Sequence, residues 1–397
     1  MKRFALVVLF TSAQLFGGES SPARFDLRPP PSLRIGDWLR LDFRAKVQTD
    51  FRDLRGIDPE AGVFDLRRAR VGIEGRFLRN FEFQLERELS PTSHPWRDAY
   101  VNWRRLRKAQ VQAGKFMAPF SMDQLTGSGH LDFVNRSLVA SYLAPGRETG
   151  VVVHGRLAGK NVSYQAGLFR QDGENARNKE RQGAGGKMFV ARVTGKPGKF
   201  LPLPGILRSL EVGGASAASV VPEGPNGLRG QGTVENTFFR RLDVSGGRRR
   251  LGAEFRWQPA PFTLKGEFIT VSEERRGQGL GGEDLSSAIS RGWYLSGVWA
   301  AFRNRNSERN VLELAGRSEQ IRFGSALHPG RPTRSPRASN VLGNSDRVWS
   351  FGLNWTPNRY VRLQFNGIHE RFEDVQRAPA PGRTGFWTAH FRMQFTL

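Results

Sequence analysis

Arginine and lysine side chains alternate with apolar side chains along the stretch WLRLDFRAKVQTDF, residues 38–51. Arg40, Arg44 and Lys46 share one parity with Asp42, and the other parity is filled mostly by Leu, Phe, Ala and Val. A guanidinium stays charged at physiological pH and offers phosphate or carboxylate a fork of donors. A row of such groups along a wet wall could pass an anion from one weak site to the next. The stretch therefore predicts a strand with one face toward an aqueous anion pathway.

Arginine recurs on the polar face of other alternating stretches, which makes the same chemistry available elsewhere along the chain. The further candidates for the anion pathway are Arg68, Arg70, Arg250, Arg256 and Arg392. Acidic residues leave an alternative open, because Glu82, Glu86 and Glu88 form the polar face of the stretch that follows Arg68 and Arg70. Opposite charges on neighbouring strands pair readily. The sequence is thus compatible with an anion-conducting lumen or with a neutralised lattice of salt bridges.

Motifs for catalysis or metal binding are weak. The segment GAGGKM, residues 183–188, lacks the Ser or Thr that follows Lys in a phosphate loop. The six histidines show no metal-ligand spacing, and no GxSxG nucleophile motif is present. Cysteine is absent, which excludes disulfides and thiolate ligands. We therefore expect no cofactor, no metal and no enzymatic activity, with a barrel hydrolase acting on lipids as an alternative.

Charge and the N-terminus restrict the class of protein. The 397 residues include 61 Lys and Arg against 37 Asp and Glu, a net charge of +24. Lys2 and Arg3 precede an apolar run, Phe4–Phe10, and then small residues, which is the order of a secretory signal. We assign residues 1–21 to this signal. No later segment approaches the ~20 apolar residues of a spanning helix. An exported chain of this kind is either a secreted basic β protein that binds polyanions or a protein that crosses a membrane as strands, and we predict no nucleic-acid partner.

Alternation with a period of two residues recurs along most of the chain and is typical of strands whose two faces meet different solvents. It predicts sixteen strands, at residues 36–51, 64–77, 80–89, 96–105, 109–116, 149–158, 161–170, 187–195, 208–217, 247–258, 261–271, 291–300, 309–318, 347–356, 359–372 and 384–397.

The links between these strands fall into two length classes. Short links such as LRN, AGK and TPN alternate with long ones such as 117–148 and 218–246, and 196–207 is the one long link where a short turn is expected. Short turns at one rim and long loops at the other are typical of outer-membrane barrels, as are aromatic girdles. We predict an all-β fold, a sixteen-stranded antiparallel transmembrane β-barrel over residues 36–397, preceded by a periplasmic segment at 22–35.

Several blocks resemble the phosphate-selective porins O and P of bacterial outer membranes. They are FDLRRARVGIEG, WRDAYVNW, AGKFMAPFSMDQLTGSGHLDFVNRSL, PGRETGVVVHGRL and YQAGLFRQDGEN. The likeness is dense over 64–175 and thin from about 196 to 346. It implies a sixteen-stranded porin, usually a homotrimer in outer-membrane lipid, whose third long loop folds inward and whose arginines lead anions of the phosphate class to a lysine-rich constriction. A general porin with weak anion preference is the alternative within this class.

Carried over by position, the resemblance assigns roles to single residues. Arg67 and Arg68 are similar to ladder arginines, and Asp98 to a constriction carboxylate, although Arg67 shares its parity with apolar neighbours. No lysine lies between Lys115 and Arg136, and Gln124 stands at the position of the family's constriction lysine. We add Arg136 to the candidate pathway. The departure at Gln124 weakens the expectation of phosphate selectivity.

Overall fold

The computed structural model describes most of the chain. The described residues are 23–28, 30–58, 62–91, 95–176, 186–225, 227–228, 230–239, 242–279, 281–303, 310–325, 343–375 and 383–397. The predicted signal at 1–21 and the GAGG part of the 183–188 segment, apart from its last glycine, lie outside them. Within these ranges no helix is both long and apolar enough to cross a bilayer.

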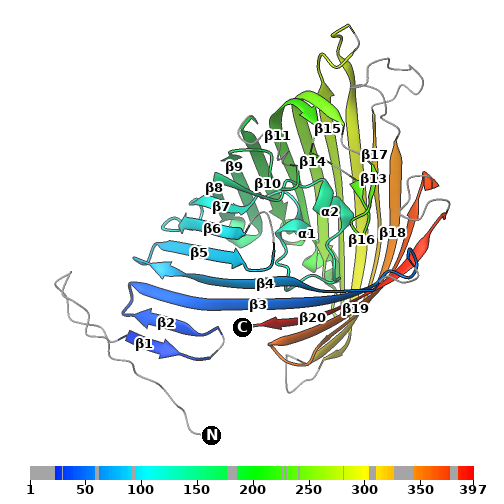
Figure 1. The fold of residues 1–397 in the computed structure, drawn as a ribbon. Helices are drawn as coiled ribbons and strands as arrows, with labels where there is room; N and C mark the ends of the chain where they lie inside the picture. The colour runs from blue at the N-terminus through cyan, green and yellow to red at the C-terminus, as the bar shows by residue number, and fades with distance from the viewer. Residues whose placement is uncertain are drawn as a thin grey trace.

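Sixteen consecutive antiparallel strands of the described chain form one closed barrel, which confirms the predicted fold (Figure 1). Each of the sixteen strands overlaps one of the sixteen predicted ranges. They are β3 (Leu39–Asp53), β4 (Gly62–Phe77), β5 (Phe81–Glu88), β6 (Trp96–Trp103), β7 (Gln110–Met117), β8 (Arg147–Leu157), β9 (Val162–Phe169), β10 (Met188–Gly195), β11 (Glu211–Pro225), β14 (Asp243–Trp257), β15 (Phe262–Arg275), β16 (Leu285–Arg303), β17 (Val311–Ser325), β18 (Asn344–Thr356), β19 (Val361–Phe372) and β20 (Phe386–Thr396).

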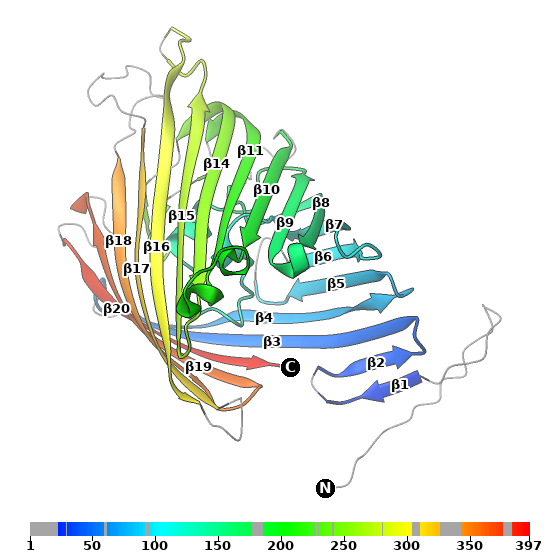
Figure 2. The same cartoon turned by 180° about the vertical axis from the view of Figure 1, so that it is seen from behind.

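The barrel closes where the last strand meets the first. Residues 389–396 of β20 pair antiparallel with residues 46–53 of β3, and the amide of Leu397 donates to the carbonyl of Ala45. Closure leaves no long free edge. A sheet in lipid has to close in this way, because unpaired backbone groups cannot be hydrated there. Figure 2 shows the outside of this curved wall from β9 to β16.

A short hairpin precedes the barrel in the predicted 22–35 segment. Its strands, β1 (Ala23–Asp26) and β2 (Ser32–Ile35), pair with each other, and β2 pairs with Leu39–Asp42 at the start of β3. The hairpin thus continues the sheet beside the first strand, where β20 has already ended. The assignment of this segment to the periplasm stays a prediction.

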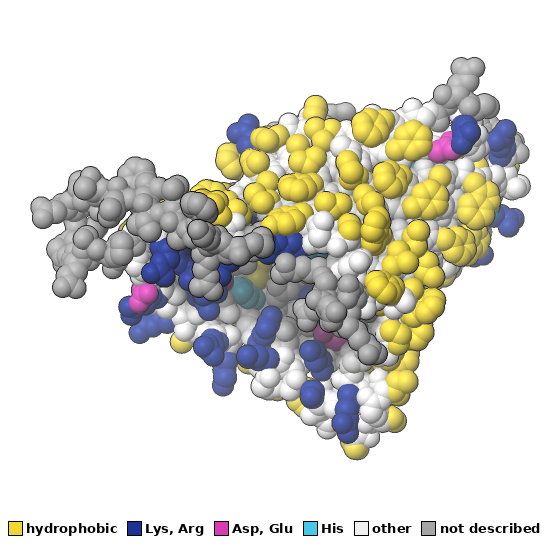
Figure 3. Space-filling model, turned by 90° about the horizontal axis from the view of Figure 1, so that it is seen from below, with side chains coloured by type: hydrophobic (Ala, Val, Ile, Leu, Met, Phe, Trp, Pro, Cys, Tyr) yellow, Lys and Arg dark blue, Asp and Glu magenta, His cyan; other side chains and the backbone are white. Residues whose placement is uncertain are grey.

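The alternation expected along β3 is present in the structure. Phe43, Val47 and Phe51 are 37–45% exposed on the outside, whereas Gln48 and Asp50 are buried inside. Hydrophobic side chains spread over a broad continuous area of the face shown in Figure 3, and Lys and Arg gather outside that area. An apolar outer band of this kind is the surface that a barrel presents to lipid.

Lipid exposure of this band can be tested on β16. Leu295 is 49% exposed and lies between the outward-facing Trp299 and Trp293. An arginine at the bilayer midplane costs about 2–4 kcal/mol, so we expect Leu295→Arg to reduce the folded fraction, measured as heat-modifiable mobility in a detergent gel. Arg44→Gln, on the inner face of β3, should assemble normally. Equal assembly of the two variants would contradict a lipid-facing Leu295.

Two loops place most of the apolar core against the inner face of β14 to β20. Loop 118–146 carries α1 (Met122–Leu125) and α2 (Leu138–Tyr142), both seen between the walls in Figure 1. Loop 226–242 carries the small pair β12 (Gly230–Gln231) and β13 (Thr237–Phe239). The ring of Phe238 lies 5.9 Å from Phe323 and 5.1 Å from Phe372. These contacts fill one side of the lumen.

The remaining link of interest, at 196–207, is compact. It contains two 3₁₀ turns, η3 (Pro197–Lys199) and η4 (Gly205–Ser209), and the indole of Trp257 donates to the carbonyl of Ile206 at 2.8 Å. The shortest links, such as η1 (Ala158–Lys160), lie at the same rim. The link at 196–207, the one long link where a short turn is expected, therefore forms a folded turn at the short-turn end of the barrel.

Candidate anion pathway

Side chains from the wall opposite β5 to β9 hold loop 118–146 in place. Arg392 on β20 donates to the carbonyl of Val134 at 2.7 Å, and Asn366 on β19 accepts from the amide of Val134 at 2.7 Å. Lys265 on β15 lies 2.6 Å from Asp132. The loop therefore crosses the inside of the barrel and is tied to strands far from its own ends.

Further contacts tie both short helices of the loop to the same wall. The hydroxyl of Ser121, which caps α1, donates to Glu267 at 2.6 Å. The amide of Leu138, the first residue of α2, donates to Glu319 at 2.6 Å. Carboxylates are favourable partners for the free amides at a helix start. These inward glutamates thus fix both helices of the loop against β15 and β17.

Three consecutive cavities border the loop: the first is lined by β3–β6, β8 and β16–β20, the second by β5–β9, and the third by β5–β11 and β14. Their volumes are about 550, 270 and 860 Å³. The first and second share Asp98, Arg147 and Gly127, and the second and third share Leu125 and Thr126. At these shared residues the cavities adjoin, and strand side chains face residues 125–127 of the loop.

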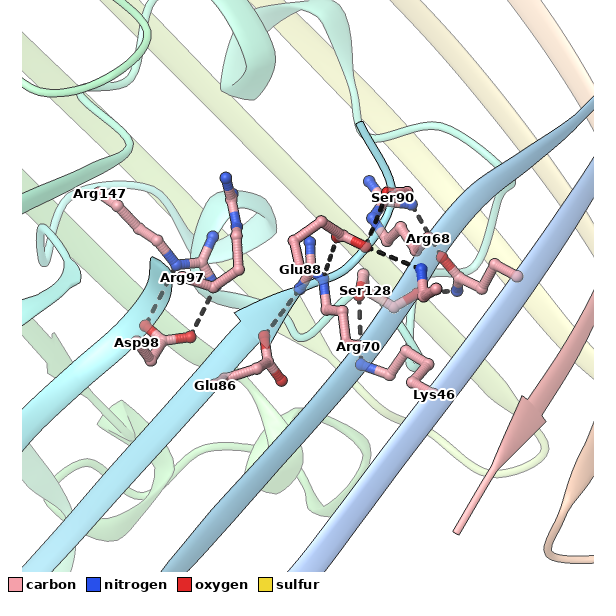
Figure 4. Close-up of polar contacts among 12 residues, drawn as sticks. Lys46, Arg68, Arg70, Glu86, Glu88, Ser90, Arg97, Asp98, Ser128 and Arg147 are labelled. Atoms are coloured by element: carbon pink, nitrogen blue, oxygen red, sulfur yellow. Dashed lines mark hydrogen bonds and ion pairs between the residues drawn. The ribbon is translucent and has the colours of Figure 1, made fainter. Parts of the chain in front are cut away.

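Six cations form what we call the basic cluster, of which four line the first or second cavity and the other two, Arg68 and Arg97, are their neighbours. They are Lys46, Arg68, Arg70, Arg97, Arg136 and Arg147, of which all but Arg136 are shown with labels in Figure 4. Three of them are paired: Arg70 lies 2.6 Å from Glu88 and 3.0 Å from Glu86, Arg97 lies 3.1 Å from Glu174, and Arg147 lies 2.9 Å from Asp98. Six cations thus face four carboxylates.

The other three cations of the basic cluster have no carboxylate within ion-pair distance among the described residues. Lys46 lies 3.3 Å from the hydroxyl of Ser128, Arg68 donates to the amide oxygen of Gln48 at 2.8 Å, and Arg136 donates to the carbonyl of Thr126 at 2.5 Å. Nη1 of Arg136 is buried without a hydrogen-bond partner in the described part of the chain. These groups leave a net positive charge beside the passage.

The electrostatic environment of the loop is consistent with that excess. Burial lowers the pKa of the Arg136 guanidinium, Asp123 raises it, and Arg147, Arg70 and Arg97 lower it further. Burial likewise lowers the pKa of His130, which lines the first cavity, and Lys46 and Arg362 add to the effect. Each is a site at which an added anion would be stabilised, because it would offset unfavourable positive charge.

The structure brings several of the predicted pathway residues together. Arg68, Arg70, Arg136 and Lys46 belong to the basic cluster, and Asp98 is one of its carboxylate partners. Arg67 departs from the parity of an ideal strand, because the register of β3 and β4 shifts beside it: Gln48 pairs with Arg68, and the next residue of β3 pairs with Leu66. The bulge turns Arg67 toward Glu235 of loop 226–242, at 3.2 Å.

Arg40, Arg44 and Arg256 lie nearer the short-turn rim, and each has a carboxylate partner. The distances are 2.9 Å from Arg40 to Asp42, 2.6 Å from Arg44 to Glu74, and 3.2 Å from Arg256 to Glu211. Arg44 lines the first cavity and Arg256 the third. The salt-bridge lattice considered from the sequence is therefore present at these positions.

Three other candidates are placed away from the passage. Arg250 is 1% exposed, pairs with Asp172 at 2.6 Å and donates to the carbonyl of Leu143 at 3.0 Å. Arg392 is fully covered and holds Asp50. Gln124 is buried in α1, and it is absent from the lining of the three cavities, where Leu125 and Thr126 stand instead. We therefore omit Arg250, Arg392 and Gln124 from the pathway.

The sequence does not predict that Arg97 and Arg147 belong to the basic cluster, because their parity along an ideal strand would point both side chains outward. The register of β5 and β6 shifts between Leu85 and Arg87, next to the start of β6, and Arg147 is the first residue of β8. Strand ends and bulges re-aim side chains. The one available signal is position: Arg97 is the second residue of the predicted strand 96–105, and Arg147 lies two residues before the predicted strand 149–158. In the described part of the chain, no group of three or more His, Asp and Glu could hold a metal ion.

Solved structures with the same fold share little sequence with this chain. OmpT of Vibrio cholerae superposes with a TM-score of 0.59 at 10% identity, over 92% of this chain and 99% of that one. An anion-selective porin from Comamonas acidovorans gives 0.58 at 11%, over 90% and 100%, and the channel DcaP of Acinetobacter baumannii gives 0.55 at 9%, over 92% and 99%. No match was found among curated protein sequences.

The family comparison covers most of the sequence. The model of the phosphate-selective porins O and P matches residues 40–202 and 233–397. The two matches include fifteen of the sixteen barrel strands, apart from the first residue of β3, and the break between them contains β11. The chain belongs to the phosphate-selective porin O and P family and is a β-barrel of the bacterial outer membrane.

Proposed function

We propose that this porin is an anion-preferring diffusion channel for small anions, with phosphate and its oligomers as the first candidates. One observation carries the proposal: Lys46 and Arg136 line the passage, with Arg68 next to them, and none of the three has a carboxylate partner within the described chain. A low-dielectric passage lined by one sign of charge concentrates counter-ions. The Comamonas acidovorans protein that shares this fold is an anion-selective porin, which supports the same class of activity.

Weak binding along the passage favours throughput over capture. Conduction requires a site that an ion enters readily and also leaves. Here the free cations are spread over β3, β4 and loop 118–146, and the other three are already engaged by carboxylates. We infer that phosphate is conducted without tight retention. A general porin with weak anion preference is the second candidate, favoured by the ion pairs of Arg40, Arg44 and Arg256.

Planar-bilayer recording of the purified protein distinguishes the two candidates. In a KCl gradient the reversal potential should have the sign of chloride selectivity, and phosphate at rising concentration should reduce chloride current in a saturable way. A chloride preference without saturable phosphate inhibition would support the general porin. Cation selectivity would contradict both. We propose a homotrimer as the assembly, and cross-linking in native membranes tests it separately.

The histidine in the loop provides a pH test of the pathway. Burial and nearby cations lower the pKa of His130 from its ordinary 6.5, so the side chain is neutral at pH 7 and gains a positive charge only in acid. Chloride selectivity should therefore rise as the pH falls from 7 through this lowered pKa. His130→Gln should reduce the rise, while His369→Gln, on the outer face beside Trp349, should not. An identical pH profile in wild type and His130→Gln would show that His130 does not face the ions.

A further inference from the structure

A row of arginines points outward from the barrel near the ends of four neighbouring strands. Its members, which we call the outer arginine row, are Arg291 on β16, Arg322 on β17, Arg347 on β18 and Arg371 on β19. All four are exposed. They share parity with lipid-facing residues of the same strands, such as Leu295, Leu314, Phe351 and Phe365. The row therefore belongs to the outside of the barrel and not to the anion pathway.

The row lies immediately beyond a belt of aromatic side chains. On β16 Trp293 is the next outward residue from Arg291, and on β18 Trp349 is the next from Arg347. The ring of His369, between Trp349 and Trp387, continues the belt at 5.6 and 5.0 Å. Aromatic girdles mark the level of the lipid headgroups. The outer arginine row thus stands at headgroup height, at the end of the barrel where the long loops lie.

The strand register puts like charges directly opposite one another. Arg291 pairs in register with Arg322, and Arg347 pairs with Arg371. Directly opposed residues have Cβ atoms about 4.5–5.5 Å apart, and like charges there are destabilising. Two such pairs side by side are unfavourable in the isolated barrel. An anion held between the members of each pair would reverse the sign of that interaction.

The described chain itself supplies little negative charge to the row. Arg322 lies 3.2 Å from Glu373, and both side chains are about half exposed. Arg347 donates to the amide oxygen of Gln320 at 3.3 Å and lies 6.0 Å from the ring of Trp349. Among described residues no carboxylate is within ion-pair distance of Arg291, Arg347 or Arg371. As far as the described residues are concerned, these three guanidinium groups keep their charge for an external anion.

We propose that the outer arginine row binds the phosphate groups of lipid headgroups in the outer leaflet. Long loops lie on the extracellular side of such barrels, so the row faces the outer leaflet of the membrane. Guanidinium binds phosphate through paired, charge-assisted hydrogen bonds, and the row offers several such groups at one height. A phosphorylated lipid would seat its acyl chains on the apolar band and its phosphates between the opposed arginines. This site is separate from the channel and does not depend on its selectivity.

Native mass spectrometry of the detergent-solubilised full chain can test the site. The probes are diphosphorylated lipid A and the same lipid after enzymatic dephosphorylation. We expect the wild type to bind the phosphorylated form at least about tenfold more tightly, since hydrogen bonds to charged groups are the stronger kind. The variant Arg291→Gln/Arg347→Gln/Arg371→Gln should lose this preference. The matched control, Arg79→Gln/Arg105→Gln/Arg208→Gln, removes the same charge from exposed residues at the opposite rim and should keep it.

The remaining outcomes each overturn the proposal. If the wild type does not distinguish the two lipids, the row does not recognise phosphate. If the triple variant retains the preference, other residues carry it. If the variant instead shifts the oligomer distribution with no change in lipid preference, the row is a contact between copies of the chain. Heat-modifiable mobility verifies that every variant is a folded barrel, and because the substituted side chains are exposed, we expect all of them to fold.

Discussion

Neutralising the three free cations of the passage should abolish anion preference. We expect Lys46→Gln/Arg68→Gln/Arg136→Gln to move the reversal potential in a KCl gradient to zero or to the cation side. The variant keeps Arg70, Arg97 and Arg147 against Glu86, Glu88, Asp98 and Glu174, so the sign of the local charge reverses. Unit charges about 8 Å apart interact by roughly 2 kcal/mol at an effective dielectric constant of about 20. A change of at least about tenfold in the chloride-to-potassium permeability ratio is therefore expected.

A control variant that loses the same number of charges shows whether the shift in reversal potential depends on where the charges lie or only on the net charge of the lumen. Arg40→Gln/Arg104→Gln/Arg256→Gln removes three positive charges nearer the short-turn rim, where the side chains are 30–40% exposed. Salt screens exposed charges strongly, so the shift in reversal potential should be less than half that of the first variant and should vanish in high salt. Equal shifts for the two variants would mean that the total charge of the lumen, and not the basic cluster, sets selectivity.

The strands of the barrel could be predicted because lipid and water impose opposite requirements on alternate residues. Even the range 309–318, where the alternation is least regular, overlaps the first half of β17 (Val311–Ser325). Strand ends are harder to predict. The alternation ends at 217, but β11 continues to Pro225, because beyond the membrane a strand needs only a neighbour to pair with and no apolar face. The hairpin of β1 and β2 has the same explanation.

The pathway could be predicted only in part, since pairing depends on register and parity alone does not give it. The sequence predicts that glutamates of β5 pair with arginines of β4, and Arg70 confirms this with Glu86 and Glu88. By contrast, Arg250 and Arg392 share the inward parity of Arg70, yet loops cover them. Whether an inward arginine lines the passage, as Arg70 does, depends on where residues 118–146 cross the lumen, and local alternation carries no information about that.

The loop itself depends on a buried ion pair, and breaking that pair should release it. Arg392 binds Asp50 through two contacts of 2.6 Å and also donates to Val134 of the loop, and it is fully covered. Arg392→Gln leaves Asp50 as an unpaired buried charge, which costs about 3–5 kcal/mol. We expect a large drop in the thermal midpoint of the barrel together with a higher, noisier single-channel conductance, because the wall of the passage formed by residues 125–127 becomes mobile.

A second substitution distinguishes loss of the loop contact from loss of charge balance. Asp50→Asn added to Arg392→Gln removes the uncompensated carboxylate, so most of the stability should return, because the effects of substitutions at interacting residues are not additive. The conductance change should persist, since the hydrogen bond from Arg392 to Val134 is still missing. The exposed pair of Arg44 and Glu74 gives the reference, because such pairs contribute only about 0–1 kcal/mol. If Arg392→Gln were no more destabilising than Arg44→Gln, the loop would have to be held by its glutamate contacts on β15 and β17, and the passage would keep its width.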